Sequence, residues 1–285
     1  MRPYYITTDF LRTFIQAALH EDVGEGDHST LASIPSEKQG KAQLLVKDNG
    51  ILAGVDLAIE IFKQFDSSLE VQVNLADGAR VAPGDVAFAV LGSVRSILTT
   101  ERLVLNCMQR MSGIATHTNW LVKLVEGTGA KLLDTRKTTP NFRLLEKWAV
   151  LIGGGQNHRI GLYDMIMLKD NHIDMAGGAE QAIIRTKEYL RAIKRDLKIE
   201  VETRTLKEVG EVMQIGGVDV IMLDNMSLQD MRESVKLIDG RCRTEASGGI
   251  TEHTIRSVAE CGVDYISVGA LTHSVKSLDL SLKVY

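Results

Sequence analysis

The chain has 285 residues, of which 44% are hydrophobic and 25% are charged, and its formal net charge is −4. This length allows one large domain or two ordinary ones, and the composition is that of a soluble globular enzyme. A weakly negative chain lacks the broad basic surface that binds nucleic acid, so an anionic ligand would need a local cluster of cations.

The first residues, MRPYYITTDFLRTF, lack a basic segment followed by an apolar one, and no stretch is long and apolar enough to span a bilayer. The three cysteines, Cys107, Cys242 and Cys261, form no C-x-x-C pair and fall in helical or apolar patterns. We therefore expect a cytoplasmic protein with no membrane partner and with structural cysteines.

The first hundred residues contain short strands and tight turns. Residues 41–54, KAQLLVKDNGILAG, predict a β-hairpin around Asn49-Gly50, followed by a helix over 55–65. Further strands are expected over 71–75 and 86–94, around turns rich in glycine and proline. This pattern indicates a small α+β domain.

A long helix over about 100–126 follows and is expected to bridge two domains, although Gly113 weakens its middle. We place the first domain at residues 1–113 and the second at 114–273. Residues 274–285 show no further strand and helix, and we expect them to pack back on the first domain.

The second part repeats one unit, in which a short apolar run ends in polar residues and a helix-like stretch follows. Continuous apolar runs that alternate with helices are typical of buried parallel strands. Six such runs are visible, too few for a closed eight-stranded barrel, so we predict an open or incomplete α/β barrel. Their ends read LLDTRK, MIMLKDNH, IEVETR, VIMLDN, TEASGG and YISVGA. The helices between them are expected at 142–152, 178–194, 206–215, 228–238 and 252–261.

The ends of parallel strands meet at one edge of the sheet, so the polar residues there should converge. Arg136 and Lys137 follow the first of these runs, and a glycine-rich stretch leads to His158 and Arg159. Arginine offers a planar fork to carboxylates and phosphates, lysine offers a mobile charge, and histidine can donate a hydrogen bond. Lys169 follows the next run, where it could form a Schiff base or stabilise an anion.

Glu202 and Asp224 lie at the ends of successive predicted strands. Hard carboxylate oxygens among phosphate-binding groups are the usual ligands of Mg²⁺, whereas a glycosidase-like acid/base pair is disfavoured by the surrounding cations. The last two runs end in glycine-rich turns of the kind that hold phosphate in barrel enzymes. These turns contain Ser247, Gly248, Gly249, Gly269 and Ala270.

In their order and combination, these motifs resemble the quinolinate phosphoribosyltransferase family over nearly the whole chain. The segments that carry the resemblance are ERLVLNCMQRMSGIAT, LLDTRKTTP, GGGQNHRIGLYDMIMLKDNHI, Glu202 at its strand end, VIMLDN, EASGGI and ISVGALTHS. The resemblance implies a small N-terminal α/β sandwich domain, an open α/β barrel and a homodimer or higher homo-oligomer with shared active sites. It also implies that quinolinate and phosphoribosyl pyrophosphate give nicotinate mononucleotide, pyrophosphate and carbon dioxide, with Mg²⁺.

The resemblance assigns a role to each matching residue. Arg136, Lys137, His158, Arg159 and Lys169 are similar to the quinolinate-binding cluster, and Arg102 to an arginine lent by the partner subunit. The residues similar to catalytic ones are Lys137, Lys169, Glu202 and Asp224, the last two as ligands of ribose and of the magnesium pyrophosphate. The residues similar to the 5′-phosphate cradle are Ser247, Gly248, Gly249, Gly269 and Ala270.

Other functions are compatible with parts of the same pattern. Relatives that use nicotinate or another pyridine-like acid, or that serve molybdenum-related functions, are disfavoured by the full set of cations. An aldolase-like lyase would use Lys169 as a Schiff-base lysine. A purely binding role, suggested by the biotinyl-like turn ADGARVAPGD, lacks a lysine at the tip of the facing hairpin.

Overall fold

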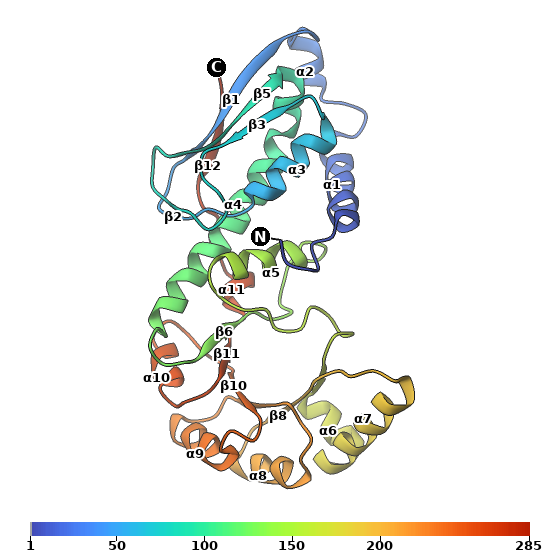
Figure 1. Ribbon diagram of the computed structural model, residues 1–285, viewed down its shortest axis with the longest axis vertical. Coiled ribbons are helices and arrows are strands. Elements are labelled where there is room, and N and C mark those ends of the chain that lie inside the picture. The colour runs from blue at the N-terminus through green and yellow to red at the C-terminus, as the bar shows by residue number, and fades with distance from the viewer. Residues whose placement is uncertain (1) are drawn as a thin grey trace. The chain divides into compact units, whose positions relative to one another are not determined.

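The computed structural model describes residues 2–285, which form two compact units that we describe separately (Figure 1). The first unit contains the chain up to Asn119, Thr138–Gly154 and Ala270–Tyr285. The second contains Trp120–Lys137 and Gly155–Gly269. The predicted domain limits stay a prediction, and no sequence pattern indicates that Thr138–Gly154 groups with the N-terminal part.

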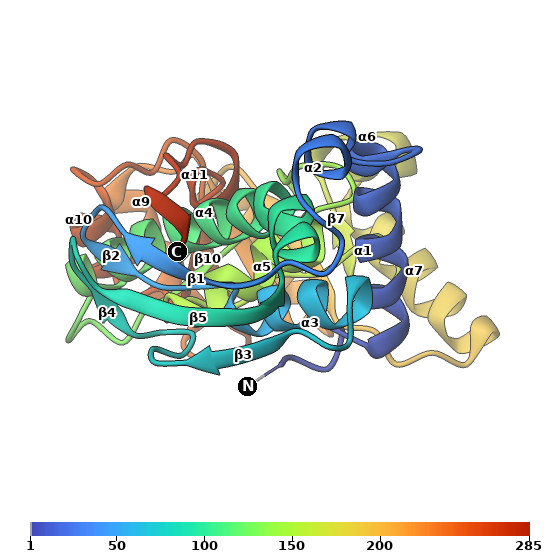
Figure 2. The ribbon, with the colours of Figure 1, turned by 90° about the horizontal axis from the view of Figure 1, so that it is seen from above.

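The first unit is built on a four-stranded antiparallel sheet in the order β12-β1-β5-β3. Figure 2 shows β1, β5 and β3 as neighbouring strands. Side chains alternate between the two faces of a strand, and β1 accordingly buries Ala42, Leu44 and Val46. The strands are β1 (Gln39–Val46), β3 (Glu70–Val73), β5 (Val86–Ser93) and β12 (Leu280–Val284).

Helix α3 packs against this sheet. Phe62 of α3 packs edge-on against Phe88 of β5, with ring centroids 6.0 Å apart, and this contact joins helix to sheet. The helices of this unit are α1 (Thr8–Val23), α2 (His28–Ser33), α3 (Val55–Phe65), α5 (Arg143–Ile152), α11 (Ala270–His273) and most of α4 (Val94–Leu124). The helix predicted over 55–65 is therefore confirmed, whereas α1 was not predicted.

The hairpin predicted over 41–54 is wrong. β2 (Gly50–Ile51) pairs with β4 (Arg80–Val81), and β1 pairs with β5 and β12 instead. The chain bends at Asp48 and Asn49, but from Gly50 it enters a separate two-stranded ladder. Long-range pairing has thus overridden the local turn signal.

The C-terminal residues return to the first unit as strand β12, which pairs with β1. On the way the backbone of Lys276 passes so close to Gly113 of α4 that a β-carbon at Gly113 would overlap its carbonyl oxygen. The glycine that weakens the middle of the helix is therefore needed for this close approach.

The second unit contains a six-stranded sheet in the order β6-β11-β10-β9-β8-β7, in which every pair is parallel. The two outer strands are β6 and β7, so the sheet is an open α/β barrel, as predicted from the six apolar runs. Its strands are β6 (Lys131–Leu133), β7 (Ile166–Leu168), β8 (Ile199–Thr203), β9 (Val220–Asp224), β10 (Arg243–Ser247) and β11 (Tyr265–Ser267).

Helices follow these strands, and side chains cap several of them. Thr205 accepts a hydrogen bond from the backbone N–H of Glu208 at the start of α8, and Ser227 accepts one from Asp230 at the start of α9. These caps begin two helices whose predicted limits are confirmed. The helices of this unit are α6 (Asp170–Ala176), α7 (Ala179–Ile193), α8 (Leu206–Ile215), α9 (Leu228–Ile238) and α10 (Ile255–Ala259).

Within residues 2–285, none of the helices has the length and apolar character needed to cross a membrane.

Candidate active site

Polar side chains lie at the carboxyl ends of the parallel strands of the second unit. Asp224 and Ser247 end β9 and β10 and are partners in the register of these strands. Glu202 is the next-to-last residue of β8, and Lys169 directly follows β7. In open α/β folds this edge of the sheet is where ligands bind.

Lys169 and Glu202 form an ion pair across two neighbouring strand ends. Nζ of Lys169 lies 3.9 Å from Oε2 of Glu202, and the side chains are 51% and 11% exposed. Burial raises the pKa of Glu202, Lys169 opposes this effect, and the negative charges of Asp224 and Asp170 add to it. A cation that binds between two such carboxylates offsets their mutual repulsion.

A buried aspartate fixes the loop that carries His158 and Arg159. Asp134 follows β6, and its carboxylate accepts hydrogen bonds from the backbone N–H of His158 at 2.9 Å and from the side chain of Asn157 at 2.7 Å. Gln156 also bonds the backbone of β6, through Leu132 and Asp134. The loop is therefore held against the open edge of the sheet.

The ring of His158 points into a buried cluster of two glutamates. Its Nε2 lies 3.0 Å from Oε2 of Glu200 in β8 and 3.4 Å from Oε2 of Glu245 in β10. Its Nδ1 accepts a hydrogen bond from the backbone N–H of Arg159 at 2.7 Å. Both ring nitrogens thus face groups of this chain, and the prediction that His158 donates to a substrate carboxylate stays a prediction.

Two members of this cluster, His158 and Glu200, have shifted pKa values. Burial lowers the pKa of His158, but the two glutamates outweigh it and raise that pKa to about 10. Burial and Glu245 raise the pKa of Glu200 to about 7. Because Nδ1 accepts the backbone N–H of Arg159, Nε2 is the ring nitrogen that presents a proton to the two carboxylates.

Two guanidinium groups lie near each other at this edge. Burial lowers the pKa of Arg159, and the positive charge of Arg136 lowers it further, while Glu200 and Asp164 act in the opposite direction. The guanidinium of Arg159 is directed along β7 by contacts with the carbonyl of Met165 and the sulfur of Met167. Two cations that repel one another are suited to an anion that binds both.

The turn after β10 requires glycine. Gly248 has φ +89° and Gly249 has φ +61°, and a β-carbon at Gly248 would overlap the side chain of Asn225. Asn225 is itself held by a hydrogen bond from its backbone N–H to the carbonyl of Ser247 at 2.8 Å. The turn thus presents backbone N–H groups beside Ser247, in a form suited to a phosphate.

The remaining predicted residues lie elsewhere in the chain. Lys137 follows Arg136 in the loop after β6, where its backbone N–H bonds Oγ1 of Thr135 at 3.0 Å. Gly269 closes the second unit, and Ala270 begins α11 of the first unit. Arg102 lies in the part of α4 that belongs to the first unit. The structure thus brings most of the predicted residues to one edge of the barrel, and Arg102 and Ala270 are placed outside that unit.

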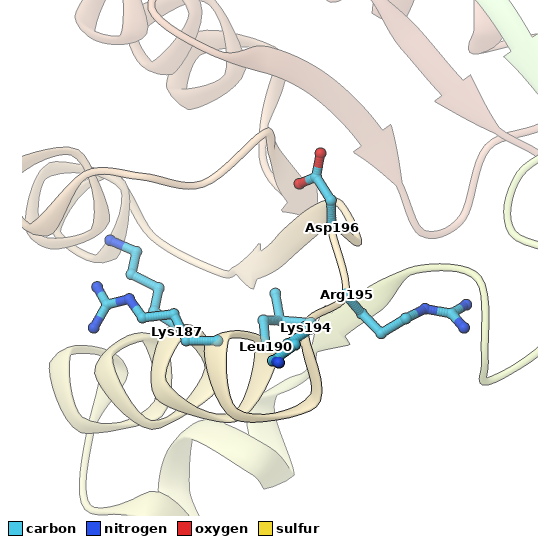
Figure 3. Close-up of a pocket in the computed structure, with 6 residues that line it drawn as sticks. Lys187, Leu190, Lys194, Arg195 and Asp196 are labelled. Carbon is cyan, nitrogen blue, oxygen red and sulfur yellow. The ribbon is translucent and has the colours of Figure 1, made fainter.

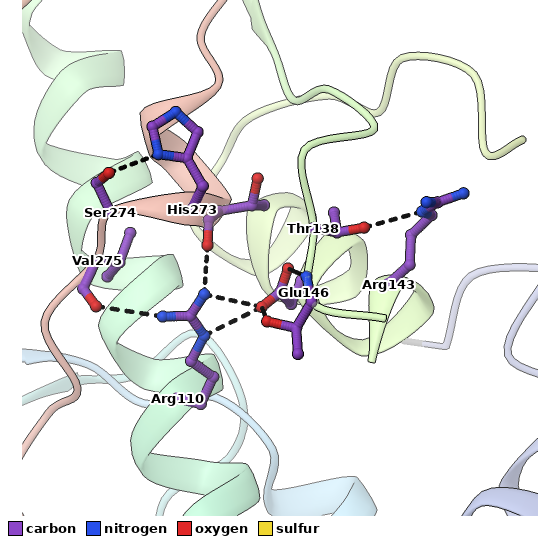
Figure 4. Close-up of polar contacts among 9 residues, drawn as sticks. Arg110, Thr138, Arg143, Glu146, His273, Ser274 and Val275 are labelled. Atoms are coloured by element: carbon purple, nitrogen blue, oxygen red, sulfur yellow. Dashed lines mark hydrogen bonds and ion pairs between the residues drawn. The ribbon is translucent and has the colours of Figure 1, made fainter. Parts of the chain in front are cut away.

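Sequence reasoning missed a polar network in the first unit (Figure 4). The buried carboxylate of Glu146 in α5 accepts hydrogen bonds from Arg110 of α4 and from both the backbone N–H and the hydroxyl of Thr139. Arg110 also donates to the carbonyls of Thr272 and Val275. A charged residue inside the apolar run RLLEKWAV was the signal that could have revealed it.

A surface hollow at the end of α7 is rich in cations but has no convergent geometry (Figure 3). The side chains of Lys187 and Arg195 point to opposite sides, and Lys187 already donates to the carbonyl of Gly216 at 2.7 Å. Cations near the C-terminus of a helix are explained by its dipole. The hollow is lined by Lys187, Leu190, Arg191, Lys194, Arg195 and Asp196.

The open parallel barrel, with cations, two carboxylates and a glycine turn at its strand ends, is typical of an enzyme that acts on a phosphorylated and carboxylated substrate. The family models agree in detail. Residues 27–112 match the N-terminal domain of quinolinate phosphoribosyl transferase, and residues 114–283 match its C-terminal domain. The chain belongs to the quinolinate phosphoribosyl transferase family.

Relatives and solved structures are similar over nearly the whole chain. A protein of Oryza sativa subsp. japonica, named nicotinate-nucleotide pyrophosphorylase [carboxylating], chloroplastic, is 48% identical, covering 99% of this chain and 79% of the rice protein. A probable enzyme of the same name from Bacillus subtilis (strain 168) is 43% identical over 93% of this chain and 90% of its own. The structure of NadC from Streptococcus pyogenes is 43% identical, with a TM-score of 0.93 over 98% of both chains.

Proposed function

We infer that this chain is a decarboxylating phosphoribosyltransferase that converts quinolinate and phosphoribosyl pyrophosphate into nicotinate mononucleotide, pyrophosphate and carbon dioxide, a step of NAD biosynthesis. Membership of the family and the names of relatives such as those from rice and Bacillus subtilis support this activity. The observation that carries it is the mutual repulsion of Arg136 and Arg159 at the strand ends. A substrate with two adjacent carboxylates would satisfy both guanidinium groups at once.

Four cations would bind the pyridine dicarboxylate. Arg136 and Arg159 offer planar forks, and Lys137 and Lys169 offer point charges that neutralise the remaining carboxylate oxygens. We keep His158 with this group, as part of the loop that Asp134 holds. Fixed cations of this kind would also orient the ring so that its nitrogen faces the ribose.

Glu202 and Asp224 would bind the ribose hydroxyls and a magnesium ion, directly or through water. Their hard oxygens and their mutual repulsion fit a divalent cation, since the charge of Asp224 contributes to the raised pKa of Glu202. The ion would neutralise charge on the departing pyrophosphate. Lys169, 3.9 Å from Glu202, would place a further positive charge beside the same leaving group.

The 5′-phosphate would be bound by the turns after β10 and β11. Ser247 offers a hydroxyl, and the positive φ of Gly248 and Gly249 turns their backbone toward the ligand. Gly269 and Ala270 form the turn after the last strand, which serves the same purpose in many barrel enzymes.

The reaction needs no covalent bond to the protein. The ring nitrogen forms a bond to the anomeric carbon of ribose as the bond from that carbon to pyrophosphate breaks, and the electron pair leaves with pyrophosphate. The nitrogen becomes positive, so the ring accepts the electrons of the bond to the 2-carboxylate when carbon dioxide leaves, and a proton then replaces it. A Schiff base would require a desolvated amine, whereas Lys169 is 51% exposed beside Glu202.

We further propose a homodimer with shared active sites, in which Arg102 of the partner subunit adds to the cations of each barrel. A twofold contact would create two equivalent sites of this kind. We also propose a cytoplasmic location, which the free thiols of Cys107, Cys242 and Cys261 fit. The names of plant relatives include the words chloroplastic and mitochondrial, so location differs within the family.

The direct test is incubation of the purified protein with quinolinate, phosphoribosyl pyrophosphate and Mg²⁺, followed by mass detection of nicotinate mononucleotide and of carbon dioxide from carboxyl-labelled quinolinate. Equal amounts of nucleotide and labelled carbon dioxide are expected. A matched reaction with nicotinate should give far less product. Product from nicotinate at the same rate would show instead that the chain does not require the dicarboxylate.

A further inference from the structure

The two glutamates buried against His158, Glu200 and Glu245, have no part in the chemistry described above. In the described part of the chain, Oε1 of Glu200 and Oε1 of Glu245 accept no hydrogen bond although they are buried. Two buried carboxylates cost folding free energy, so their presence one layer below the strand ends requires an explanation. Glu200 lies two residues before Glu202, and Glu245 two residues before Ser247, so each shares a strand face with a residue of the proposed site.

The cluster is connected to Arg159 by one short path. Glu200 and Glu245 contact Nε2 of His158, and Nδ1 of His158 accepts the backbone N–H of Arg159. Asp134 accepts the backbone N–H of His158 itself. Strands β8 and β10, together with Asp134 directly after β6, therefore supply the groups that fix the backbone from which the Arg159 side chain projects.

We propose that Glu200 and Glu245 are positioning residues that act through His158 to set the backbone and guanidinium of Arg159 for the substrate carboxylate. This inference rests on the proposed function, because it assigns a task to the supports of the same site. In the ring of His158, Nε2 faces the two carboxylates and Nδ1 faces the backbone N–H of Arg159. His158 would therefore affect the binding of quinolinate indirectly, through the position of Arg159.

A metal centre is the other arrangement that these three side chains could form, since one ligand atom from each lies within 4.8 Å of the others. A histidine that binds a metal through Nε2 ordinarily donates a proton from Nδ1 to a neighbouring acceptor. Here Nδ1 accepts a hydrogen bond from Arg159, so the ring proton is on Nε2, which then has no lone pair for a metal. The geometry favours the positioning role.

The test is a double-mutant cycle on the full-length enzyme with Glu245→Gln and Arg159→Lys. Glu245→Gln keeps the size of the side chain and should raise the KM for quinolinate about tenfold, with little change in kcat or in the KM for phosphoribosyl pyrophosphate. In the Arg159→Lys background the same change should have much less effect, because the group that Glu245 positions is already altered. Glu233→Gln, on the exposed side of α9, is the matched control.

Equal effects of Glu245→Gln in both backgrounds would overturn the proposal, as would a fall in kcat with unchanged KM. Should Glu245→Gln fail to fold, the ring nitrogens of His158 in the unmodified protein can be observed by ¹⁵N NMR. A protonated Nε2 with an unprotonated Nδ1 is expected, and a protonated Nδ1, or metal bound in stoichiometric amount, would exclude the proposed path. Absence of turnover in the unmodified protein would count against the proposed function instead, which the NMR result does not depend on.

Discussion

Arg110 donates two hydrogen bonds to one carboxylate oxygen of Glu146, from Nε at 3.1 Å and from Nη2 at 2.8 Å. The glutamate is fully buried and the arginine side chain is 25% exposed, so the pair joins α4 to α5 largely out of contact with water. The same carboxylate holds Thr139. The pair thus holds two helices of the first unit together. Removal of either partner leaves a buried charge without its counter-ion.

Arg110→Met should therefore lower the free energy of unfolding by about 3 kcal/mol, since it leaves the Glu146 carboxylate buried and uncompensated. The matched control is Arg12→Met, which removes an arginine paired with Asp9 at 2.7 Å where both side chains are more than half exposed. That change should cost less than about 1 kcal/mol. Urea unfolding followed by circular dichroism measures both, and equal losses in the two variants would contradict the argument.

Arg136→Ala should abolish measurable binding of quinolinate. Removing one partner of a desolvated carboxylate costs about 2–5 kcal/mol. Isothermal titration with quinolinate checks this, and binding of phosphoribosyl pyrophosphate serves as the control that the barrel is folded. Quinolinate affinity within twofold of the unmodified protein would remove Arg136 from the site.

Glu202→Gln and Asp224→Asn keep the size of each side chain and remove its charge. Turnover should fall far more than quinolinate affinity, because these carboxylates act on the ribose and on the metal–pyrophosphate leaving group. Steady-state kinetics with a magnesium titration provides the measurement. Normal turnover in both variants, or full activity of the unmodified enzyme in excess chelator, would rule out the metal role.

Asp264 makes stability depend on pH in the acid range. Burial alone would raise its pKa, but hydrogen bonds from Thr244 and Arg243 outweigh burial and lower that pKa below 3.8. A carboxyl with a lowered pKa in the folded state stabilises the fold above its unfolded pKa, and this contribution is lost as the pH falls through the folded pKa.

Asp264→Asn should therefore destabilise the protein by about 1 kcal/mol at neutral pH, with the difference shrinking below about pH 4. Thermal unfolding of both proteins between acid and neutral pH measures this difference. A difference that does not change with pH would mean that the ionised carboxylate contributes nothing beyond what asparagine supplies.

The open barrel could be predicted because five of its six strands are buried on both faces, β7 being only partly buried, and strands of this kind form apolar runs that end in polar residues. Glu202 and Asp224 could be identified because they lie at the ends of such runs. Glu200 and Glu245 lie inside the runs, where the only sign of a special role is a charged residue among apolar ones. Their meeting at His158 depends on the register of strands that are distant in sequence, which periodicity does not encode.

The first unit was harder to predict because its sheet joins distant segments. The Asn49-Gly50 turn suggested that β1 pairs with the strand that follows it, yet β1 lies between β5 and the C-terminal strand β12. Nothing local to residues 280–284 indicates which strand they will join. Sequence patterns thus gave the units that are built from adjacent segments and failed where pairing spans the whole chain.

The shared active site can be tested by mixing subunits. Arg102 lies in α4, before the first barrel strand, and the family resemblance assigns it to the barrel of the partner subunit. Arg102→Ala and Lys169→Ala homodimers should each be nearly inactive, because every site lacks one cation. In a heterodimer one of the two sites receives both intact residues, from opposite subunits.

With random pairing half of the dimers are heterodimers, each with one good site of two, so co-refolded mixtures should regain about a quarter of the unmutated activity. Native mass spectrometry of differently tagged subunits establishes that heterodimers have formed. Each variant refolded alone in the same way is the control for activity that refolding itself restores. Only a site made from two subunits can be restored by mixing two inactive variants. If heterodimers form and the mixture stays as inactive as each variant alone, Arg102 therefore acts in the barrel of its own chain or in the fold of the first unit.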